Sequence, residues 1–346
     1  MHMADALVSP GVGGIMLAAS AGAAAYSLKK ISRNREDEDI PLMGVTGAFV
    51  FAAQMLNFAI PGTGSSGHLG GGLLLAFILG PCRAFLAMAA VLLIQALFFA
   101  DGGLLAYGCN LFNLGFISSF LVYPLFCRPL LRRLAAGGGL FPAAFFGAVI
   151  SLQLGALGVT LETTVSGMTS LSFLDFALLM QPIHLAIGAV EGLATWAVAT
   201  HVWRVRPELL EAAPAARQPT ANRSLILSLA AATLVAGCLL SWLASPLPDG
   251  LEWSLERANA EESQTAREGI HSALADLQEK TSLLPDYGFP AGDDAGEAGE
   301  KEEAWPAVEA GTSLSGLLGA VLTCGLAMSA GLLAAGFRRR TAAKNG

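Results

Sequence analysis

The sequence predicts an all-α polytopic membrane protein. Of its 346 residues, 54% are hydrophobic and only 14% are charged, whereas soluble domains average about 45–50% and about 25%. Long apolar runs recur along the chain, and most approach the roughly 20 residues that a helix needs to cross a bilayer. The 40 glycines are typical of closely packed membrane helices. The net charge of −7 argues against nucleic acid as a partner.

Nine apolar segments are candidate membrane helices. They lie at 8–28, 42–60, 69–80, 84–100, 103–126, 139–160, 175–202, 225–245 and 312–336. The segment 69–80 is short, because its helix would reach only about 18 Å and the hydrocarbon core is about 30 Å thick. We therefore expect its outer end to begin deep in the membrane. The loop before it, PGTGSSGH, must then dip inward, where irregular backbone needs protein or a cavity around it.

The basic residues predict the orientation of these helices. With the N-terminus outside, 16 of the 20 Lys and Arg residues fall in inside segments. The other four lie in the long loop between the last two helices, so that no short outside loop carries a basic residue. The pattern favours nine spans with the N-terminus outside and the C-terminus in the cytoplasm. Without the short span 69–80, this alternation fails.

The chain divides into three predicted parts. Residues 1–204 form a compact seven-helix unit, and 205–222, rich in Pro and Ala, form a cytoplasmic linker. Residues 223–346 form a two-helix hairpin with a long outside loop at 246–311. That loop holds sixteen Asp and Glu against four Lys and Arg. Its part 251–280 has helical spacing, and the stretch AGDDAGEAGEKEEAW is expected to be flexible and solvated.

The first two residues offer a metal chelate. No basic residue precedes Lys29, so a cleaved signal peptide is not expected. The Met1 amine, the main-chain amide nitrogen of His2 and the His2 imidazole can bind one ion through a five-membered and a six-membered ring. Ni²⁺ and Cu²⁺ favour such planar nitrogen sets, whereas Zn²⁺ prefers tetrahedral sites. His68, which closes the dipping loop on the same side, is the candidate fourth donor. The alternative is that His2 is simply exposed.

Several polar residues are candidates to support the metal ligands or a coupling contact, because polar groups within membrane segments are functional suspects. They are Ser65, Ser66, Asn57, Asn110, Asn113, His184 and Glu191. The alternative for each is ordinary hydrogen bonding between helices. Asp101 is expected to cap the helix that starts near residue 103, and His201 and His271 are expected to be exposed. GTGSSG has the spacing of a dinucleotide fingerprint but lacks the preceding strand that this motif needs.

Four segments together resemble one family. MHMADALVSPG, GTGSSGHLGGGLLLAFILGP, VLLIQALFFADGGLLAYGCNLFNLG and QPIHLAIGAVEG are similar to the substrate-capture (S) component of nickel/cobalt energy-coupling-factor transporters, the CbiM/NikM family. PDGLE at 248–252 resembles the PDGLE domain, a small two-helix companion that is found separate or fused. The family often begins with HIPDG, whereas this chain reads HMADA, so that the Pro and the Gly are missing.

This resemblance implies a seven-helix S component that captures an ion from outside at high affinity. It implies ligation by the Met1 amine, the His2 amide and imidazole, and His68. The implied partners are a membrane coupling (T) protein, cytoplasmic ATPase subunits and the lipid of a bacterial inner membrane. The chain has no GxxxxGK[ST] phosphate loop, so we expect ATP hydrolysis in the separate ATPase subunits. As a membrane transport component, the chain itself is not expected to be an enzyme. We expect no cofactor besides the transported ion.

Nickel is the expected cargo, and cobalt is the alternative within the same class. Ni²⁺ fits planar four-nitrogen geometry more readily and stands above Co²⁺ in the affinity order. A proton-coupled secondary carrier that uses Glu191 and Asp101 is the alternative from another class. An intramembrane metalloprotease would need a motif such as HExxH, which the sequence does not contain.

Overall fold

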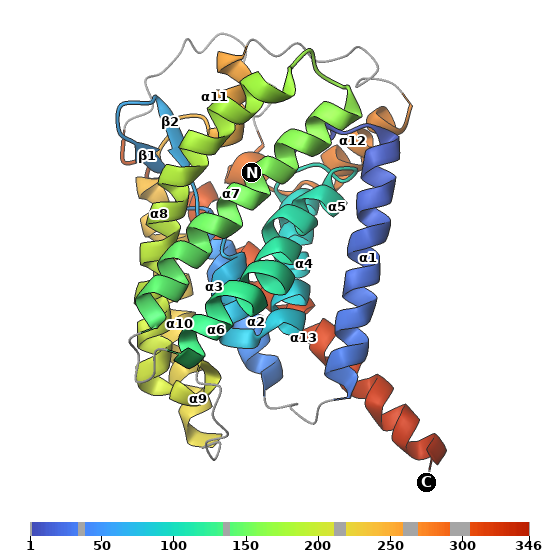
Figure 1. Cartoon of the computed structure of the whole chain (residues 1–346), viewed down its shortest axis with the longest axis vertical. Coiled ribbons are helices and arrows are strands. Elements are labelled where there is room, and N and C mark those ends of the chain that lie inside the picture. The colour runs from blue at the N-terminus through green and yellow to red at the C-terminus, as the bar shows by residue number, and fades with distance from the viewer. Residues whose placement is uncertain are drawn as a thin grey trace.

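A computed structural model describes residues 2–33, 39–133, 139–210, 219–258, 269–290 and 305–345. These residues form a bundle of long helices with a small hairpin and short helices at one end (Figure 1). The helices are α1 (Pro10–Ser32), α2 (Ile40–Gln54), α3 (Gly72–Leu79), α4 (Pro81–Phe98), α5 (Tyr107–Asn110), the π-helical η3 (Leu111–Cys127), α6 (Arg128–Arg133), α7 (Leu140–Ser166), α8 (Phe173–Val205), α9 (Pro207–Leu210), α10 (Pro219–Cys238), α11 (Gly250–Arg257), α12 (Ile270–Thr281) and α13 (Ala310–Asn345). Short 3-10 turns lie at η1 (Asp5–Leu7), η4 (Leu240–Leu243) and η6 (Pro285–Tyr287).

The helices confirm a multi-pass membrane protein. Six described helical segments are long and apolar enough to cross a bilayer, namely α1, α4, the continuous stretch Tyr107–Arg133, α7, α8 and α13. Two more, α2 and the part of α10 from Arg223, are apolar but shorter. Each of the nine predicted segments overlaps one of these helices or α3. Part of the predicted linker, 211–218, and most of the predicted flexible acidic stretch, 291–304, lie outside the described residues.

The predicted segment 42–60 differs from the structure at its outer end. The helix α2 ends at Gln54, and the chain then forms the strand β1 (Phe58–Ile60). This strand pairs antiparallel with β2 (Ser65–Gly67), so that Ala59 lies opposite Ser66. The pairing satisfies main-chain groups that a longer helix would have satisfied internally. The loop that was expected to be irregular is therefore a hairpin.

The helix α3 is the predicted short segment, and all eight of its residues are buried. Glycines with positive φ bound it on both sides, Gly71 at φ 73° and Gly80 at φ 72°. A side chain at Gly71 would also meet Val50 of α2. Glycine alone adopts this backbone conformation at little cost. The two turns allow the chain to enter the bundle from the hairpin and to reverse immediately into α4.

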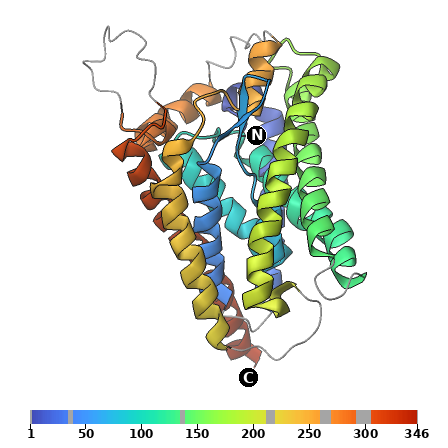
Figure 2. The same ribbon diagram turned by 90° about the vertical axis from the view of Figure 1, so that its left-hand side faces the viewer.

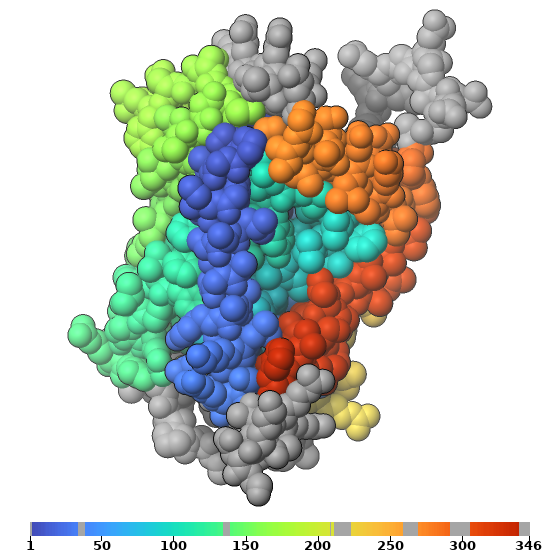
Figure 3. Space-filling model, turned by 90° about the vertical axis from the view of Figure 1, so that its right-hand side faces the viewer, coloured from blue at the N-terminus to red at the C-terminus, as the bar shows by residue number. Residues whose placement is uncertain are grey.

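The C-terminal helices pack directly on the N-terminal part of the chain. Both α10 and α13 contact α2, and α13 also contacts α1 and α4, as Figure 2 shows for α10 beside α2. Gly237 of α10 and Gly316 of α13 allow these two helices to approach closely, because a Cβ at Gly316 would meet the Gly237 carbonyl. On another face, α12 lies over the ends of α1 and α4 (Figure 3). The fused C-terminal segment is thus part of one packed bundle.

Candidate metal centre

His2 and His68 lie side by side at the hairpin end of the bundle. Their ring centroids are 5.0 Å apart and the ring planes differ by 4°. The side chains are 6% and 10% exposed. With metal–nitrogen bonds of about 2 Å, two imidazoles at adjacent corners of one ion would have centroids about 4.5 Å apart. The rings are stacked, with their lone pairs in parallel planes, so one ring must turn as well as approach before both can bind one ion. Met1 lies outside the described residues.

A main-chain contact determines which nitrogen His68 can offer to a metal. Its Nδ1 lies 3.1 Å from the carbonyl oxygen of Leu69, and a carbonyl can only accept, so Nδ1 carries the proton. The lone pair is then on Nε2, as is common where the other ring nitrogen of a ligand is held by a carbonyl. Burial lowers the pKa of His68 to about 4. The ring is therefore neutral at pH 7 and does not have to lose a proton in order to bind an ion.

The segment that follows His2 is fixed by Asn110. The amide of Met3 donates to Asn110 Oδ1 at 2.8 Å, and Asn110 Nδ2 donates to the Met3 carbonyl at 3.1 Å. Two residues further on, Asp5 Oδ1 accepts from the amides of Leu105 at 2.7 Å and Ala106 at 3.0 Å. Asn110 thus holds the backbone directly after His2, and its predicted role in supporting the metal ligands stays a prediction. Asp5, which the sequence reasoning did not select, anchors the same segment.

The loop that follows His68 is fixed by Glu191 of α8. The two carboxylate oxygens of Glu191 accept from the amides of Gly70 at 2.7 Å and Gly71 at 3.0 Å. Gln54 Nε2 donates to the carbonyl of Gly70 at 2.8 Å. Glu191 is 2% exposed, and its two bonds satisfy it inside the bundle. The carboxylate therefore determines where the backbone next to His68 lies.

The candidates Ser65 and Ser66 bind the C-terminal segment rather than the histidines. The Ser66 hydroxyl donates to the carbonyl of Leu247 at 2.7 Å, and its amide donates to that of Pro248 at 2.8 Å. The next residue, Asp249, caps α11 in a capping box with Glu252. Its Oδ2 lies 3.8 Å from Nε2 of His68. The hairpin thus brings a carboxylate from residue 249 to the candidate metal ligand.

Asp101 faces His2, and the prediction that it caps a helix is wrong. The helix begins only at Tyr107, and Asp101 Oδ1 lies 3.1 Å from His2 Nδ1. Its Oδ2 accepts from the hydroxyl of Tyr287 at 2.6 Å. Burial raises the pKa of Asp101, but the neighbouring His2 and the Tyr287 hydroxyl outweigh it and bring that pKa below its usual value. The carboxylate is therefore ionised beside the candidate ligand.

Three other candidates lie apart from direct contact with the two histidines. Asn113 donates to Glu162 at 2.7 Å. The carbonyl of Asn57 accepts from Ser245 at 2.8 Å. His184 is buried, its Nδ1 bonds the Met180 carbonyl at 2.8 Å, and it lines a cavity of about 10 Å³ together with His68.

The remaining two histidines lie outside the candidate centre. His201 is exposed, as expected. The expectation that His271 is exposed is wrong, because it is 4% exposed and its Nε2 lies 2.9 Å from the carbonyl of Val8. Since α12 folds over the start of the chain, this ring is covered.

A cavity of about 380 Å³ opens beside the two histidines. Besides these rings, five carboxylates line it, and its described lining contains neither Lys nor Arg. These carboxylates are Asp5, Asp101, Asp249, Glu252 and Asp286. Such a pocket attracts cations electrostatically. Among the described residues, no group of three His, Cys, Asp or Glu side chains is placed to hold a metal ion. The predicted ligand set differs from such a group because two of its four donors belong to the main chain or the terminal amine.

The fold and the site define a multi-pass membrane protein with two paired histidines beside an acidic cavity that attracts cations. The family model described as the cobalt uptake substrate-specific transmembrane region matches residues 2–209, and the chain belongs to this family. A second family model, the PDGLE domain, matches residues 223–336. The resemblance to the nickel/cobalt family and to the PDGLE domain is therefore confirmed.

Named relatives agree with this assignment. The chain is 29% identical over 362 residues to the fused nickel transport protein NikMN of Rhodobacter capsulatus, which covers 96% of this chain and 98% of the relative. It is 30% identical over 217 residues to the cobalt transport protein CbiM of Sorangium cellulosum, covering 61% and 95%. A crystal structure of a transition metal transporter aligns with a TM-score of 0.52 at 32% identity, covering 60% of this chain and 95% of that one. The chain is thus a transport component for metal uptake.

Proposed function

We propose that this chain captures Ni²⁺ outside the cell and delivers it inward as the substrate-specific component of an ATP-driven energy-coupling-factor transporter. The ligands are the Met1 amine, the His2 amide and imidazole, and His68. The observation that carries the proposal is the pairing of His2 and His68 at 5.0 Å between ring centroids. A membrane coupling protein and cytoplasmic ATPase subunits are the proposed partners. The seven helical segments before residue 205 form the capture unit, and α10 with α13 forms the companion hairpin.

The proposed orientation places the acidic cavity outside the plasma membrane and the C-terminus in the cytoplasm. Basic residues support it, since Lys29 and Lys30 end α1, Arg83 begins α4 and Arg204 ends α8. These helix ends lie at the end of the bundle opposite the hairpin (Figure 1). Cytoplasmic segments of membrane proteins carry such an excess of Lys and Arg.

Nickel is proposed as the preferred ion, and cobalt uptake by the same mechanism is the alternative. A deprotonated amide donor binds most strongly to an ion that favours planar nitrogen coordination, and Ni²⁺ adopts this geometry more readily than Co²⁺. The fused relative that covers most of the chain is described as a nickel transport protein. This favours nickel, whereas the relative named for cobalt covers only the first part of the chain.

The metal content of the purified chain tests the proposed site. With an unmodified N-terminus, we expect one Ni²⁺ per chain and the yellow colour of a planar, diamagnetic nickel complex. His68→Ala removes the fourth nitrogen and is expected to lower the affinity at least a hundredfold. His201→Ala is the matched control, because His201 is exposed and lies outside the site. Stoichiometric cobalt instead of nickel would move the function to cobalt uptake, and binding that is indifferent to His68→Ala would refute the site.

Uptake by cells tests the proposed energy source. We expect accumulation of Ni²⁺ only when the chain is expressed together with a coupling protein and active ATPase subunits. The physical reason is that the chain carries no phosphate-binding loop with which to use ATP itself. Inactivation of the ATPase by a substitution in its own phosphate-binding loop should abolish uptake. Uptake that survives this change but is lost with a protonophore would favour the secondary carrier instead.

A further inference from the structure

The C-terminal segment reaches the metal centre through a short turn at 282–288. The amides of Leu283 and Leu284 donate to the carbonyl of Phe98 at 3.0 Å and 3.1 Å, and the amide of Asp286 donates to that of Phe99 at 2.9 Å. These bonds join the turn to the end of α4, directly before Asp101. The turn is therefore docked on the backbone that carries this carboxylate.

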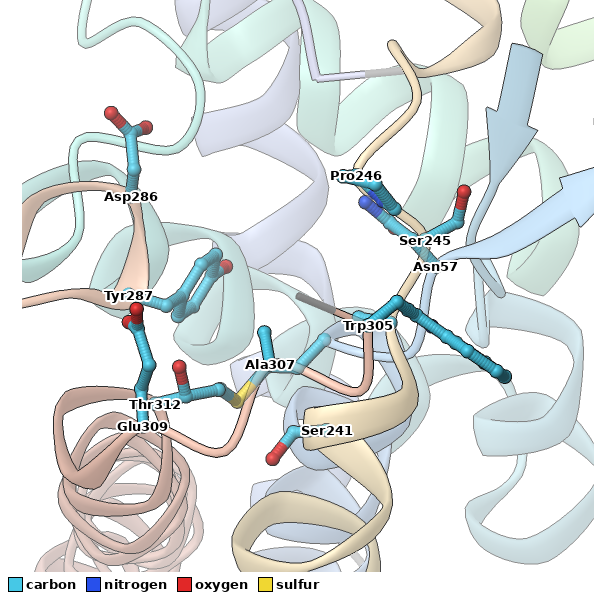
Figure 4. A pocket seen from close by; sticks show the side chains of 12 residues that line it. Asn57, Ser241, Ser245, Pro246, Asp286, Tyr287, Trp305, Ala307, Glu309 and Thr312 are labelled. Atoms are coloured by element: carbon cyan, nitrogen blue, oxygen red, sulfur yellow. The ribbon is translucent and has the colours of Figure 1, made fainter. Parts of the chain in front are cut away.

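The turn has a strained backbone that points one phenol at the site. Asp286 and Tyr287 have positive φ angles of 50° and 61°, a backbone conformation that residues other than glycine rarely adopt. The ring of Tyr287 stacks on Phe99 at 5.0 Å between centroids and meets Phe51 at 6.2 Å. Figure 4 shows Tyr287 and Asp286 at the wall of an adjoining cavity, which is also lined by Thr312 of α13 and by Glu309 directly before that helix. Strain of this kind persists where the surroundings hold it, and it often marks a functional position.

The Tyr287 hydroxyl belongs to a hydrogen-bond network that reaches both sides of the metal centre. It donates to Asp101 at 2.6 Å and accepts from Gln95 Nε2 at 3.3 Å. Gln95 also donates to Gln54 at 2.9 Å, and Gln54 donates to the carbonyl of Gly70 in the loop after His68. A chain of bonds thus runs from the partner of His2 to the loop of His68. Tyr287 is its contribution from the C-terminal segment.

A bound ion needs the charge that this network holds in place. Ni²⁺ with one deprotonated amide leaves a net charge of +1 between two rings that are 6% and 10% exposed. A buried charge without a partner is costly. The Asp101 carboxylate, 3.1 Å from His2 Nδ1, is placed to balance it. The six-membered chelate ring would form through Nδ1 of His2, the same atom that Asp101 contacts. When the ion binds, the Asp101 carboxylate therefore loses this contact with Nδ1 but remains next to the ion.

We propose that Tyr287 of the PDGLE domain is a positioning residue of the metal centre, which holds the Asp101 carboxylate beside His2 as the counter-charge of the bound ion. The inference rests on the proposed function, since it needs an ion at His2 and His68. It makes the companion domain part of the binding site rather than only a neighbour of it. Loss of the phenol would free Asp101 to rotate into the adjoining cavity and would weaken binding.

The test measures Ni²⁺ affinity of the full chain by competition with a chelator. Tyr287→Phe keeps the stacked ring and removes only the hydroxyl. We expect the dissociation constant to rise about 10-fold to 100-fold, the range typical for the loss of a group that orients a ligand. The visible absorption band at saturating Ni²⁺ should keep its position, because the four nitrogens are unchanged. Tyr26→Phe is the matched control, since Tyr26 is an exposed residue of α1.

A double-mutant cycle separates positioning from general damage to the fold. In an Asp101→Ala background, Tyr287→Phe should not lower the Ni²⁺ affinity further, because the carboxylate that Tyr287 holds is absent. An unchanged affinity in Tyr287→Phe, or its full effect persisting without Asp101, would overturn the inference. If the parent chain binds Ni²⁺ through His68 while Tyr287→Phe binds as tightly, the proposed function stands and this inference alone falls. If the parent chain binds no Ni²⁺, both fall together.

Discussion

An extension of the chain by three residues before Met1 is expected to abolish high-affinity Ni²⁺ binding. The extension moves the terminal amine away and converts the Met1 nitrogen into an amide. The five-membered ring then loses its amine donor, while the His2 imidazole and His68 are retained. Because chelation depends on donors already joined at the right spacing, we expect a loss of more than a hundredfold in affinity. The same three residues added after Gly346 are the control.

Thermal unfolding of the extended chain distinguishes the loss of the amine donor from damage to the fold. The segment after His2 is held by Asn110 and Asp5 through main-chain bonds at Met3, Leu105 and Ala106, none of which requires a free amine. Thermal unfolding of the extended chain without metal should therefore match that of the parent. Tight, yellow Ni²⁺ binding by the extended chain would show that the amine is not a ligand. An unfolding temperature that falls together with affinity would instead point to a steric effect.

Hydropathy and covalent geometry were sufficient to predict a multi-pass helical membrane protein and to select His2 and His68 as a candidate pair. The apolar runs follow from the bilayer thickness, and the twelve-residue run at 69–80 could be recognised as short for the same reason. The chelate at residues 1–2 follows from ring sizes that any chain beginning Met-His offers. His68 could be placed near it because positive-inside counting put its loop on the same side. None of these steps needed a contact between distant side chains.

The residues that the sequence did not reveal are those defined by packing between distant segments. Asp101 stands before a Gly-rich turn, a pattern that fits a helix cap, but it binds Tyr287, 186 positions away. The polar sequence around His271 predicts an exposed side chain, but α12 packs against the start of the chain and His271 contacts the carbonyl of Val8. Asp249 was visible within PDGLE, but its approach to His68 depends on Ser66 binding the backbone at 247–248. The three-residue strands were too short for an alternating pattern to identify.

Replacement of Glu191 by alanine is expected to weaken both the metal site and the fold. The change leaves the amides of Gly70 and Gly71 without their acceptor inside the bundle. Each buried donor left unsatisfied costs about 1–3 kcal/mol, so the free energy of unfolding should fall by roughly 2–6 kcal/mol in total. The loop that carries His68 also loses its anchor, and we expect Ni²⁺ affinity to fall at least tenfold. Thermal unfolding and chelator competition measure the two effects.

The control for Glu191 is a second buried glutamate that is remote from the ligands. Glu162 is 8% exposed and binds Asn113 within the bundle, so Glu162→Ala should destabilise the fold without changing Ni²⁺ affinity. Glu191→Gln keeps one acceptor oxygen and should fall between the parent and Glu191→Ala in both measurements. Equal losses of affinity in Glu162→Ala and Glu191→Ala would mean that binding follows general stability. A selective loss in Glu191→Ala would assign α8 a direct part in positioning His68, and would place the membrane-embedded carboxylate among the groups that set the metal affinity.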